Sequence, residues 1–325
     1  MKVATVSKVR HSAPYIVSTK TSDWIMNQVL IALIFPIIAA YYFFGIRSFF
    51  MIGFSVVMCV LLEYGYQKAL KKEVTIGDKS AVVTGILLAL TLPTTTPFWT
   101  LMIGTFIAIV LVKQVGGGIG KNSLNPAVTA RVALKLFFSP WITNWILPGV
   151  DAVSMATPLK LLGDFPYEIH SEIPTSLELF LGLQLGGPIG ETSKFVLLLS
   201  GGYLIWKKII DPIVPTVYLT SFFIYIFGYS SFDLTFSLTH LLSGTLIFAS
   251  IFMITDYSTT PWTRRGKILF AFGCGIVTAL IRLYIPYFDG GVGIAIIVMN
   301  LATPYINKVT MPRIYGSSKR IKIDG

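Results

Sequence analysis

Residues 24–44 read WIMNQVLIALIFPIIAAYYFF, an apolar run without a charged side chain. One α-helix needs about 20 such residues to cross the hydrocarbon core of a bilayer. The run is too long for the core of a signal peptide and no small-residue cleavage signature follows it, so it predicts a retained membrane span. The whole chain has the same character, because 54% of its 325 residues are hydrophobic and 13% are charged. This composition indicates a polytopic membrane protein rather than a soluble globule.

Further apolar runs predict an all-α polytopic membrane protein with about ten transmembrane helices. Several runs are short, and the third and tenth carry Gly, Pro or Thr at their ends. Helices interrupted in this way occur at membrane depth only where protein or a cavity satisfies the freed backbone groups, so we expect these two to line a site. The predicted spans are Trp24–Phe44, Ser48–Tyr66, Ala81–Leu92, Pro97–Val112, Asn125–Leu147, Ser193–Trp206, Pro212–Tyr229, Leu238–Ile254, Lys267–Ile285 and Gly291–Ile306.

The basic residues gather on one side of this topology. The two termini and the even-numbered loops hold all of the 26 Lys and Arg residues except Arg47, Lys160, Lys194 and Arg282. The opposite side contains the long acidic segment 139–192. The positive-inside rule therefore places both termini in the cytoplasm and the acidic segment outside. The formal charge of +11 reflects this topology, and no soluble basic face is present to bind nucleic acid.

On this topology the chain has five parts. Residues 1–23 form a cytoplasmic N-terminal arm, and residues 24–147 form a first membrane half. Residues 148–192 form an outward-facing loop. Residues 193–307 form a second membrane half, and residues 308–325 form a cytoplasmic basic tail.

Two groups of residues recur between the halves. Residues 83–88 and 95–100 read VTGILL and TTPFWT, and residues 242–247 and 259–263 read LSGTLI and TTPWT. The third predicted span runs outward and the matching eighth runs inward. The recurrence therefore predicts an inverted repeat of five plus five helices, an architecture whose sites lie near the membrane midplane. The same architecture leaves a small-solute channel or carrier as an alternative function.

A glycine-rich stretch precedes the fifth predicted span. Residues 116–122 read GGGIGKN, but Val115 stands where a P-loop needs glycine and Asn122 replaces its Ser or Thr. Asn125 is a good N-cap for the helix that carries Arg131. The free N–H groups at this helix start could receive an anion or a polar ring edge. The alternative is that these glycines only allow close packing between membrane helices.

Residues 151–159 read DAVSMATPL and place Thr157 directly before a proline in the acidic segment. Spacing alone makes this stretch an ordinary loop, because a residue before proline is extended and Ser and Thr hydroxyls bond nearby backbone. Cys59 and Cys274 lie in apolar runs and provide no cluster for zinc or iron and sulfur, so redox chemistry in this chain would have to be organic. No histidine has a second ligand at helical spacing, and we assign no metal site.

Nearly the whole chain resembles a family that contains the D subunit of the Rnf electron-transport complexes and, more distantly, the B subunit of the sodium-pumping NADH:quinone oxidoreductase. The resemblance is to the Rnf type, because the quinone-reducing relative normally has a longer region before the first span; that relative is the alternative. The matching stretches are residues 12–15 (SAPY), 117–131 (GGIGKNSLNPAVTAR), 151–159 (DAVSMATPL), 190–193 (GETS) and 255–261 (TDYSTTP).

The resemblance implies that FMN is joined by a phosphoester to Thr157. The family attaches FMN to the final threonine of an Asp-x-x-Ser/Thr-x-Ala-Thr motif, which here comprises Asp151, Ser154, Ala156 and Thr157. Asp151 and Ser154 would shape the turn or meet the flavin transferase. That enzyme works outside the cytoplasmic membrane, in agreement with the orientation from charge. Met155 departs from the small residue that the family commonly has.

The resemblance also places Gly118, Gly120, Asn122, Asn125 and Arg131 beside a flavin. This flavin is either the covalent FMN, with the fifth helix dipping partway into the membrane, or a second noncovalent flavin such as riboflavin nearer the cytoplasm. Residue types do not decide between these two arrangements.

The implied function is that of a membrane flavoprotein within an ion-translocating ferredoxin:NAD+ oxidoreductase (Rnf) complex of a bacterial or archaeal cytoplasmic membrane. Its FMN would relay electrons, and electron passage would drive Na+ or H+ translocation. The implied partners are iron–sulfur subunits, two small membrane subunits and a second covalently flavinylated subunit. Glu63 is the clearest in-membrane acid for an ion path; the alternative is a side chain that extends to the interface.

Overall fold

The computed structural model describes residues 21–145, 158–159, 174–183, 186–285 and 290–312, and these ranges are helical, without a strand. The first helices are α1 (Ser22–Phe44), α2 (Ile46–Ala69), the 3-10 turn η1 (Ile76–Asp78), α3 (Ser80–Leu90), α4 (Phe98–Phe106) with its π-helical continuation η2 (Ile107–Gln114), α5 (Pro126–Phe137) and α6 (Ser139–Ile142). The later helices are α8 (Ser176–Leu181), α9 (Lys194–Trp206), α10 (Ile213–Tyr229), α11 (Leu234–Leu242), α12 (Leu246–Phe252), α13 (Arg264–Tyr284) and α14 (Val292–Thr310).

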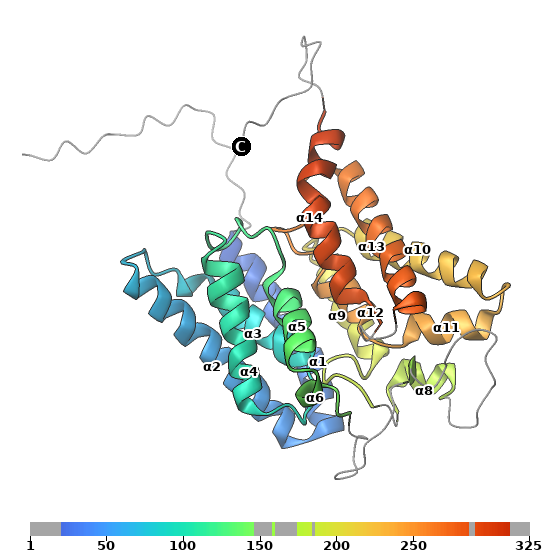
Figure 1. Ribbon diagram of the computed structural model, residues 1–325, viewed down its shortest axis with the longest axis horizontal. Coiled ribbons are helices and arrows are strands. Elements are labelled where there is room, and N and C mark those ends of the chain that lie inside the picture. The colour runs from blue at the N-terminus through green and yellow to red at the C-terminus, as the bar shows by residue number, and fades with distance from the viewer. Residues whose placement is uncertain (1–20, 146–157, 160–173, 184–185, 286–289, 313–325) are drawn as a thin grey trace, which may run out of the picture.

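The helices form two groups that meet along the middle of the molecule. Figure 1 shows α1 to α5 on one side and α9 to α14 on the other, with α5 and α14 between them. A Cβ on Gly293 of α14 would lie 2.7 Å from the Val132 side chain of α5. Helix α1 packs on α9, where the Tyr203 hydroxyl donates to Gln28 Oε1 at 2.6 Å. The two groups are thus in contact both at α5 and α14 and at α1 and α9.

The apolar helices make this chain a multi-pass membrane protein. Four helices, α1, α2, α13 and α14, are long and apolar enough to cross a bilayer, and the pair α11 and α12, bent by 53°, would be a fifth span. Helices α3, α4 with η2, α9 and α10 are apolar but shorter. Length and composition support four or five spans, and the count of ten stays a prediction.

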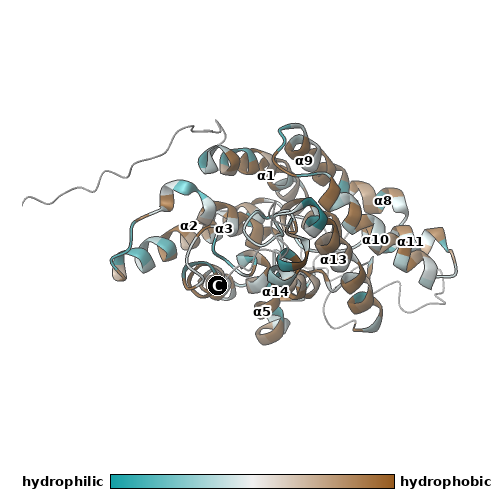
Figure 2. Cartoon of the chain, turned by 90° about the horizontal axis from the view of Figure 1, so that it is seen from above, coloured by the Kyte–Doolittle hydropathy of each residue, from teal (hydrophilic) through white to brown (hydrophobic). Residues whose placement is uncertain are grey.

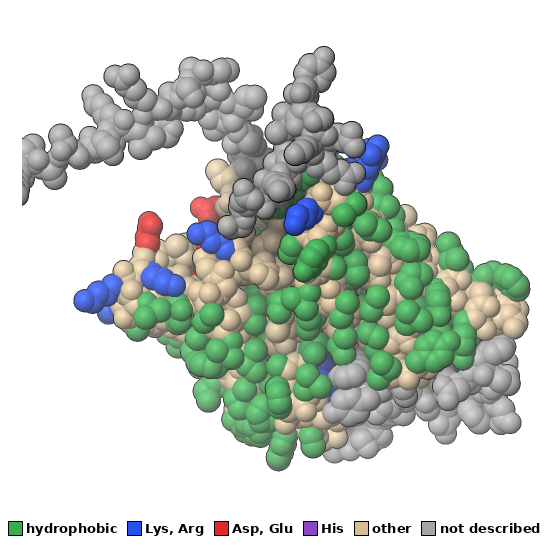
Figure 3. Space-filling model, turned by 45° about the horizontal axis from the view of Figure 1, so that its top comes forward, with side chains coloured by type: hydrophobic (Ala, Val, Ile, Leu, Met, Phe, Trp, Pro, Cys, Tyr) green, Lys and Arg blue, Asp and Glu red, His purple; other side chains and the backbone are tan. Residues whose placement is uncertain are grey.

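The surface agrees with a membrane environment. Brown, the hydrophobic colour, prevails on the helices in Figure 2. In Figure 3 hydrophobic side chains cover much of the face in view, and most of the visible Lys and Arg side chains lie along its upper edge. Side chains such as Ile38 and Phe50 are 61% and 60% exposed. Exposure of this kind is costly in water and favourable against lipid or a partner protein.

Two predicted spans are wrong as single helices. The fifth, Asn125–Leu147, contains a 12-residue helix that ends at Phe137, and Phe138 leaves the helical conformation at φ −130°. Pro140 has no amide hydrogen to bond to the Leu136 carbonyl, so α5 cannot continue through it, and the short α6 begins at Ser139. The eighth, Leu238–Ile254, breaks between α11 and α12, where Gly244 has φ +72°.

Close backbone contacts at glycines hold neighbouring helices together. A Cβ on Gly85 of α3 would lie 2.9 Å from Val56 Cα of α2, and the Ser55 hydroxyl donates to the Gly85 carbonyl at 2.8 Å. A Cβ on Gly275 of α13 would overlap Ser221 Oγ and lie 2.7 Å from the Tyr218 carbonyl of α10. Small residues at such crossings are a main source of helix association in membranes.

Glu63 lies in a buried polar cluster between α2, α3 and η2. Its side chain is 1% exposed, and Oε2 is 2.8 Å from Lys113 Nζ. Gln114 Nε2 donates to Oε1 at 2.7 Å, and Lys113 Nζ also donates to Ser80 Oγ at 2.6 Å. The alternative of a side chain extending to the interface is therefore wrong. Both Lys113 and Gln114 belong to the π-helical segment η2. π-Helical turns within α-helices are frequent at functional sites.

We expect Gly275→Ala to lower the thermal stability of the purified protein. The added Cβ has no room against the α10 backbone, and such overpacking costs about 1–3 kcal/mol. Gly202→Ala in α9 is the matched control, because nothing lies within 4 Å of its Cβ position. Melting curves in detergent compare the two; equal melting temperatures would contradict the close contact.

Removing one partner of the Glu63–Lys113 pair should destabilise the protein more than replacing both partners. Glu63→Ala leaves Lys113 buried without its partner, which costs about 3–5 kcal/mol. The double variant Glu63→Gln, Lys113→Met removes both charges and should recover much of that loss. Melting curves of the two variants measure this difference. A double variant as unstable as Glu63→Ala would show that the pairing is not the cause.

Candidate functional site

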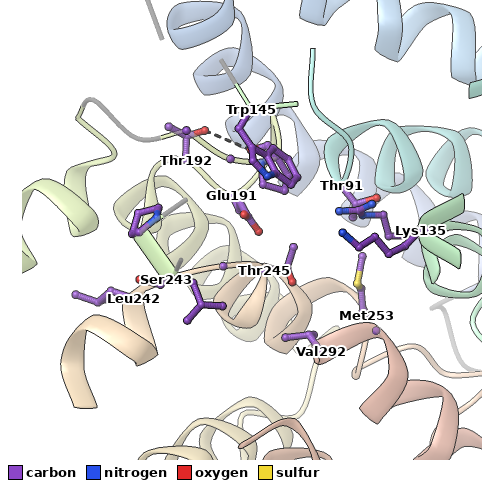
Figure 4. Close-up of a pocket in the computed structure, with 18 of the residues that line it drawn as sticks. Thr91, Lys135, Trp145, Glu191, Thr192, Leu242, Ser243, Thr245, Met253 and Val292 are labelled. Atoms are coloured by element: carbon purple, nitrogen blue, oxygen red, sulfur yellow. Dashed lines mark hydrogen bonds between the residues drawn. The ribbon is translucent and has the colours of Figure 1, made fainter. Parts of the chain in front are cut away.

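A cavity lies where the two helix groups meet at the end of α5 that carries Lys135. Its volume is about 100 Å³. Figure 4 shows its lining converging from several elements. The lining comes from the end of α3 (Thr91), α5 (Val128, Arg131, Val132, Lys135), Trp145, residues 158–159, Leu179 of α8, the loop before α9 (residues 186–188, Glu191 and Thr192), Lys194, the break between α11 and α12 (residues 242–245), Met253 and the start of α14 (Val292–Ile294).

The third and tenth predicted spans, which were expected to line a site, both border this cavity. Thr91 follows directly on α3, and Val292 to Ile294 begin α14. The loop before α9 closes the end of α3. Gly190 N donates to the Leu90 carbonyl at 2.8 Å, and Ile189 N donates to the Leu92 carbonyl at 3.1 Å. These bonds satisfy carbonyls that the helix end leaves free.

Only glycine fits at position 190 of this closing loop. A Cβ there would lie 2.6 Å from Leu90 Cβ and 3.0 Å from the Leu90 carbonyl oxygen. The following turn is fixed by Thr192, whose hydroxyl donates to the Pro188 carbonyl at 3.5 Å, the dashed line in Figure 4. Glu191 is thereby held in the cavity wall.

The charged side chains of the cavity are mostly basic. Arg131 and Lys135 come from α5, and Lys194 begins α9, where its Nζ donates to the Glu191 carbonyl. Glu191 is the one carboxylate among the described lining residues. Lys135 and Lys194 are only 8% and 3% exposed. Buried basic side chains in a membrane protein are costly unless negative charge lies nearby, and they often mark functional sites.

Two donors in the wall have no partner in the part of the chain that the structure describes. They are Trp145 Nε1 and Ser243 Oγ. The two side chains are buried, with 4% and 1% of their surface exposed. An indole N–H can only donate, and a buried donor without a partner is costly. The cavity therefore suits a ligand that offers hydrogen-bond acceptors.

The structure brings Arg131 to this cavity and leaves the glycine-rich loop apart from it. Gly118, Gly120, Asn122 and Asn125 are not among the described residues that line it. Asn125 caps α5, as predicted, by accepting from Val128 N at 3.2 Å, and its Nδ2 donates to the Met253 carbonyl at 3.4 Å. Gly118 and Gly120 have φ +90° and +78°, which only glycine adopts freely.

The predicted attachment motif lies outside the described residues. This applies to Asp151, Ser154, Ala156 and Thr157. Pro158 and Leu159, the two residues that follow Thr157 in the chain, are described, and both line the cavity.

Residues 255–261, one of the stretches that resemble the family, form a turn between α12 and α13. The Asp256 carboxylate accepts from the Ser258 hydroxyl at 3.1 Å and from the Thr259 hydroxyl at 3.3 Å. Burial raises the pKa of the Asp256 carboxyl. Asp256 is not among the described lining residues, so its role lies elsewhere.

Several lining residues were not predicted as site residues from the sequence. These are Lys135, Trp145, Glu191, Lys194 and Ser243. The available signal was charge, because Lys194 is one of the few basic residues on the acidic side of the predicted topology and Glu191 is close to it in the chain.

The chain matches known proteins over most of its length. The family model described as NQR2, RnfD, RnfE family matches residues 9–316. The D subunit of the Na(+)-translocating ferredoxin:NAD(+) oxidoreductase complex of Acetobacterium woodii is 40% identical, with 95% of each chain covered. The proton-translocating counterpart of Clostridium ljungdahlii is 36% identical, with 95% of this chain and 96% of that one covered. The corresponding protein of the ion-translocating oxidoreductase complex of Escherichia coli is 30% identical, with 95% and 98% covered. This chain therefore belongs to the NQR2, RnfD, RnfE family.

Proposed function

We propose that this chain is the D subunit of an Rnf-type ion-translocating ferredoxin:NAD+ oxidoreductase in a bacterial or archaeal cytoplasmic membrane. The names of the relatives in Acetobacterium woodii and Clostridium ljungdahlii, each matched over 95% of this chain, support this assignment. The chain would work beside iron–sulfur subunits, small membrane subunits and a second covalently flavinylated subunit.

The proposed cofactor is FMN joined to Thr157, with its flavin in the cavity. The observation that carries this proposal is that Pro158 and Leu159, next to Thr157 in the chain, line a cavity rich in buried cations and unpartnered donors. The residues present fit FMN. Trp145 Nε1 and Ser243 Oγ would donate to acceptor atoms at the ring edge, and the basic side chains would balance negative charge on the ligand.

FMN bound there would take up and pass on one or two electrons. The chain's own part is to hold the ring between α5 and α14, to limit water with the loop 186–192, and to supply the positive lining. The glycine-rich loop is set apart from this cavity, and we assign Gly118, Gly120, Asn122 and Asn125 to a second noncovalent flavin such as riboflavin.

The proposed topology has ten crossings in two inverted halves. The order α1, α2, α3, α4 with η2, α5 is followed by α9, α10, α11 with α12, α13, α14, which supports five plus five helices. The charge distribution supports cytoplasmic termini and an outward-facing acidic segment.

The coupling ion is Na+ or H+, since the two relatives named above differ in it. We propose the buried Glu63 as part of the ion path. Its carboxylate is paired with Lys113, so passage of an ion there would accompany a change in that pairing.

Thr157→Val should abolish covalent flavin. A phosphoester needs the threonine hydroxyl, which valine lacks. The chain is produced in a host with an active flavin transferase, denatured, and inspected for flavin fluorescence on a gel, followed by mass mapping of the modified peptide. Thr143→Val, outside the motif, is the control and should stay fluorescent. An unmodified wild-type Thr157 peptide from such a host would contradict covalent attachment.

Cysteine labelling should place the acidic segment outside. Leu177→Cys is at a position 67% exposed and should react with a membrane-impermeant maleimide in intact cells. Lys72→Cys, in the exposed loop after α2, should react only after lysis. The native Cys59 and Cys274 are buried and give low background. The reverse pattern of labelling would overturn the orientation.

A further inference from the structure

The buried Glu63–Lys113 pair is connected by hydrogen bonds to the loop between α2 and α3. Lys113 Nζ is 2.8 Å from Glu63 Oε2 and also donates to Ser80 Oγ at 2.6 Å. Ser80 Oγ in turn donates to Asp78 Oδ1 at 2.5 Å. Ser80 is the first residue of α3, and Asp78 is the last residue of η1. The contacts therefore run without a break from the Lys113 ammonium group to a carboxylate at the start of α3.

The two ends of this connection differ in their access to water. The Glu63 and Lys113 side chains are 1% and 2% exposed. Asp78 is half-buried, and Gly77, directly before it in the chain, is exposed. On the proposed topology the loop that follows α2 faces the cytoplasm. The connection thus leads from a dry ion pair inside the protein toward the side from which an exported ion enters.

The Asp78 carboxylate is only partly satisfied. Oδ1 accepts from Ser80 Oγ and from Ser80 N, the latter at 2.8 Å. Oδ2 is buried and has no hydrogen-bond partner among the residues that the structure describes. A buried carboxylate oxygen without a donor is costly while the group is ionised, and a proton on the carboxyl group removes that charge. Asp78 is therefore suited to receive the proton that Ser80 donates.

Lys113 is the cation that balances Glu63 within the described part of the chain. Lys79, next to Ser80 in the chain, instead donates to Asn27 Oδ1 at 2.6 Å. Cys59, one turn before Glu63 in α2, interacts electrostatically with both members of the pair, but a buried thiol is neutral and supplies no counter-charge. The charge state of Lys113 therefore decides whether the Glu63 carboxylate is compensated.

We propose that Ser80 and Asp78 form a proton relay that discharges Lys113 and so opens Glu63 to the transported cation. This inference rests on the proposed role of Glu63 in the ion path. In the relay step one N–H bond of the Lys113 ammonium breaks and its proton passes to Ser80 Oγ, while the Ser80 hydroxyl proton passes to Asp78 Oδ1. Lys113 becomes a neutral amine, Asp78 becomes a neutral carboxylic acid, and the total charge is unchanged.

Discharge of Lys113 leaves the Glu63 carboxylate without a counter-charge. An uncompensated buried charge is expensive, so a cation that reaches Glu63 is held there. The reverse transfer, from Asp78 through Ser80 to the amine, restores the ammonium group and displaces the cation. The relay serves Na+ and H+ equally, because either cation neutralises Glu63.

Three substitutions separate this relay from a structural role of Asp78 in capping α3. In Asp78→Asn the amide oxygen still accepts from Ser80 N, but the amide does not take up a proton near neutral pH. Ser80→Ala keeps the backbone amide and removes the hydroxyl group. Ser80→Thr keeps the hydroxyl group.

The test is ion uptake by inverted vesicles that contain the purified wild-type or variant complex, driven by reduced ferredoxin and NAD+. Uptake is followed with radioactive Na+ or with a pH-sensitive dye. Asp78→Asn and Ser80→Ala should slow uptake on the order of 100-fold, as loss of a positioned proton-transfer group does. Ser80→Thr should transport like wild type. Asp233→Asn is the matched control, because Asp233 likewise accepts from a backbone amide at a helix start, and it should also transport like wild type.

Melting curves of the same complexes in detergent decide whether a slow variant is a damaged one. The relay predicts that Asp78→Asn melts at the wild-type temperature although its uptake is slow. Slow uptake that is matched by a lower melting temperature in Asp78→Asn, and that Ser80→Thr shares, would show a structural role and overturn the relay. Wild-type uptake in both Asp78→Asn and Ser80→Ala would overturn it as well.

Glu63→Gln distinguishes failure of the relay from failure of the proposed ion path. Normal uptake in Glu63→Gln would remove Glu63 from the ion path, and the proposed role on which the relay rests would fall. Slow uptake in Glu63→Gln together with normal uptake in the Asp78 and Ser80 variants would overturn the relay alone.

Discussion

The backbone pairing between the end of α3 and the loop before α9 is the contact on which the site depends. A helix that stops inside a membrane protein leaves carbonyl groups without partners, and lipid cannot supply them. Here the amides of Ile189 and Gly190 bond to the carbonyls of Leu92 and Leu90. The same loop continues into Glu191, Thr192 and Lys194, so satisfying a broken helix also brings charged side chains to the cavity.

Buried charged side chains are arranged differently in two parts of the molecule. Glu63 and Lys113 form a closed pair, in which Ser80 and Gln114 complete the hydrogen bonds. The cavity instead has more basic than acidic groups among its described residues. A closed pair compensates its own charges, whereas the basic groups of the cavity wall need negative charge from elsewhere, either from other parts of the chain or from a ligand.

The sequence predicted much of the fold because apolar length and caps are local properties. The predicted first span ended at Phe44, as α1 does, and Asn125 was identified as an N-cap. The fifth span was overextended because apolar residues continue past Phe137, where a proline ends the helix. Pairings between distant residues have no local signal: Glu63 and Lys113 are 50 positions apart. The proposed role of Thr157 rests on family resemblance alone, because its local sequence pattern is that of a loop.

The contact between Gly293 and Val132 has a consequence for the size of the cavity. Helices α5 and α14 supply facing parts of its wall, and they approach each other where Gly293 has only a hydrogen atom. Any larger side chain at position 293 would press on Val132 and push the two helices apart. The spacing between these two walls of the cavity is thus set by a missing side chain.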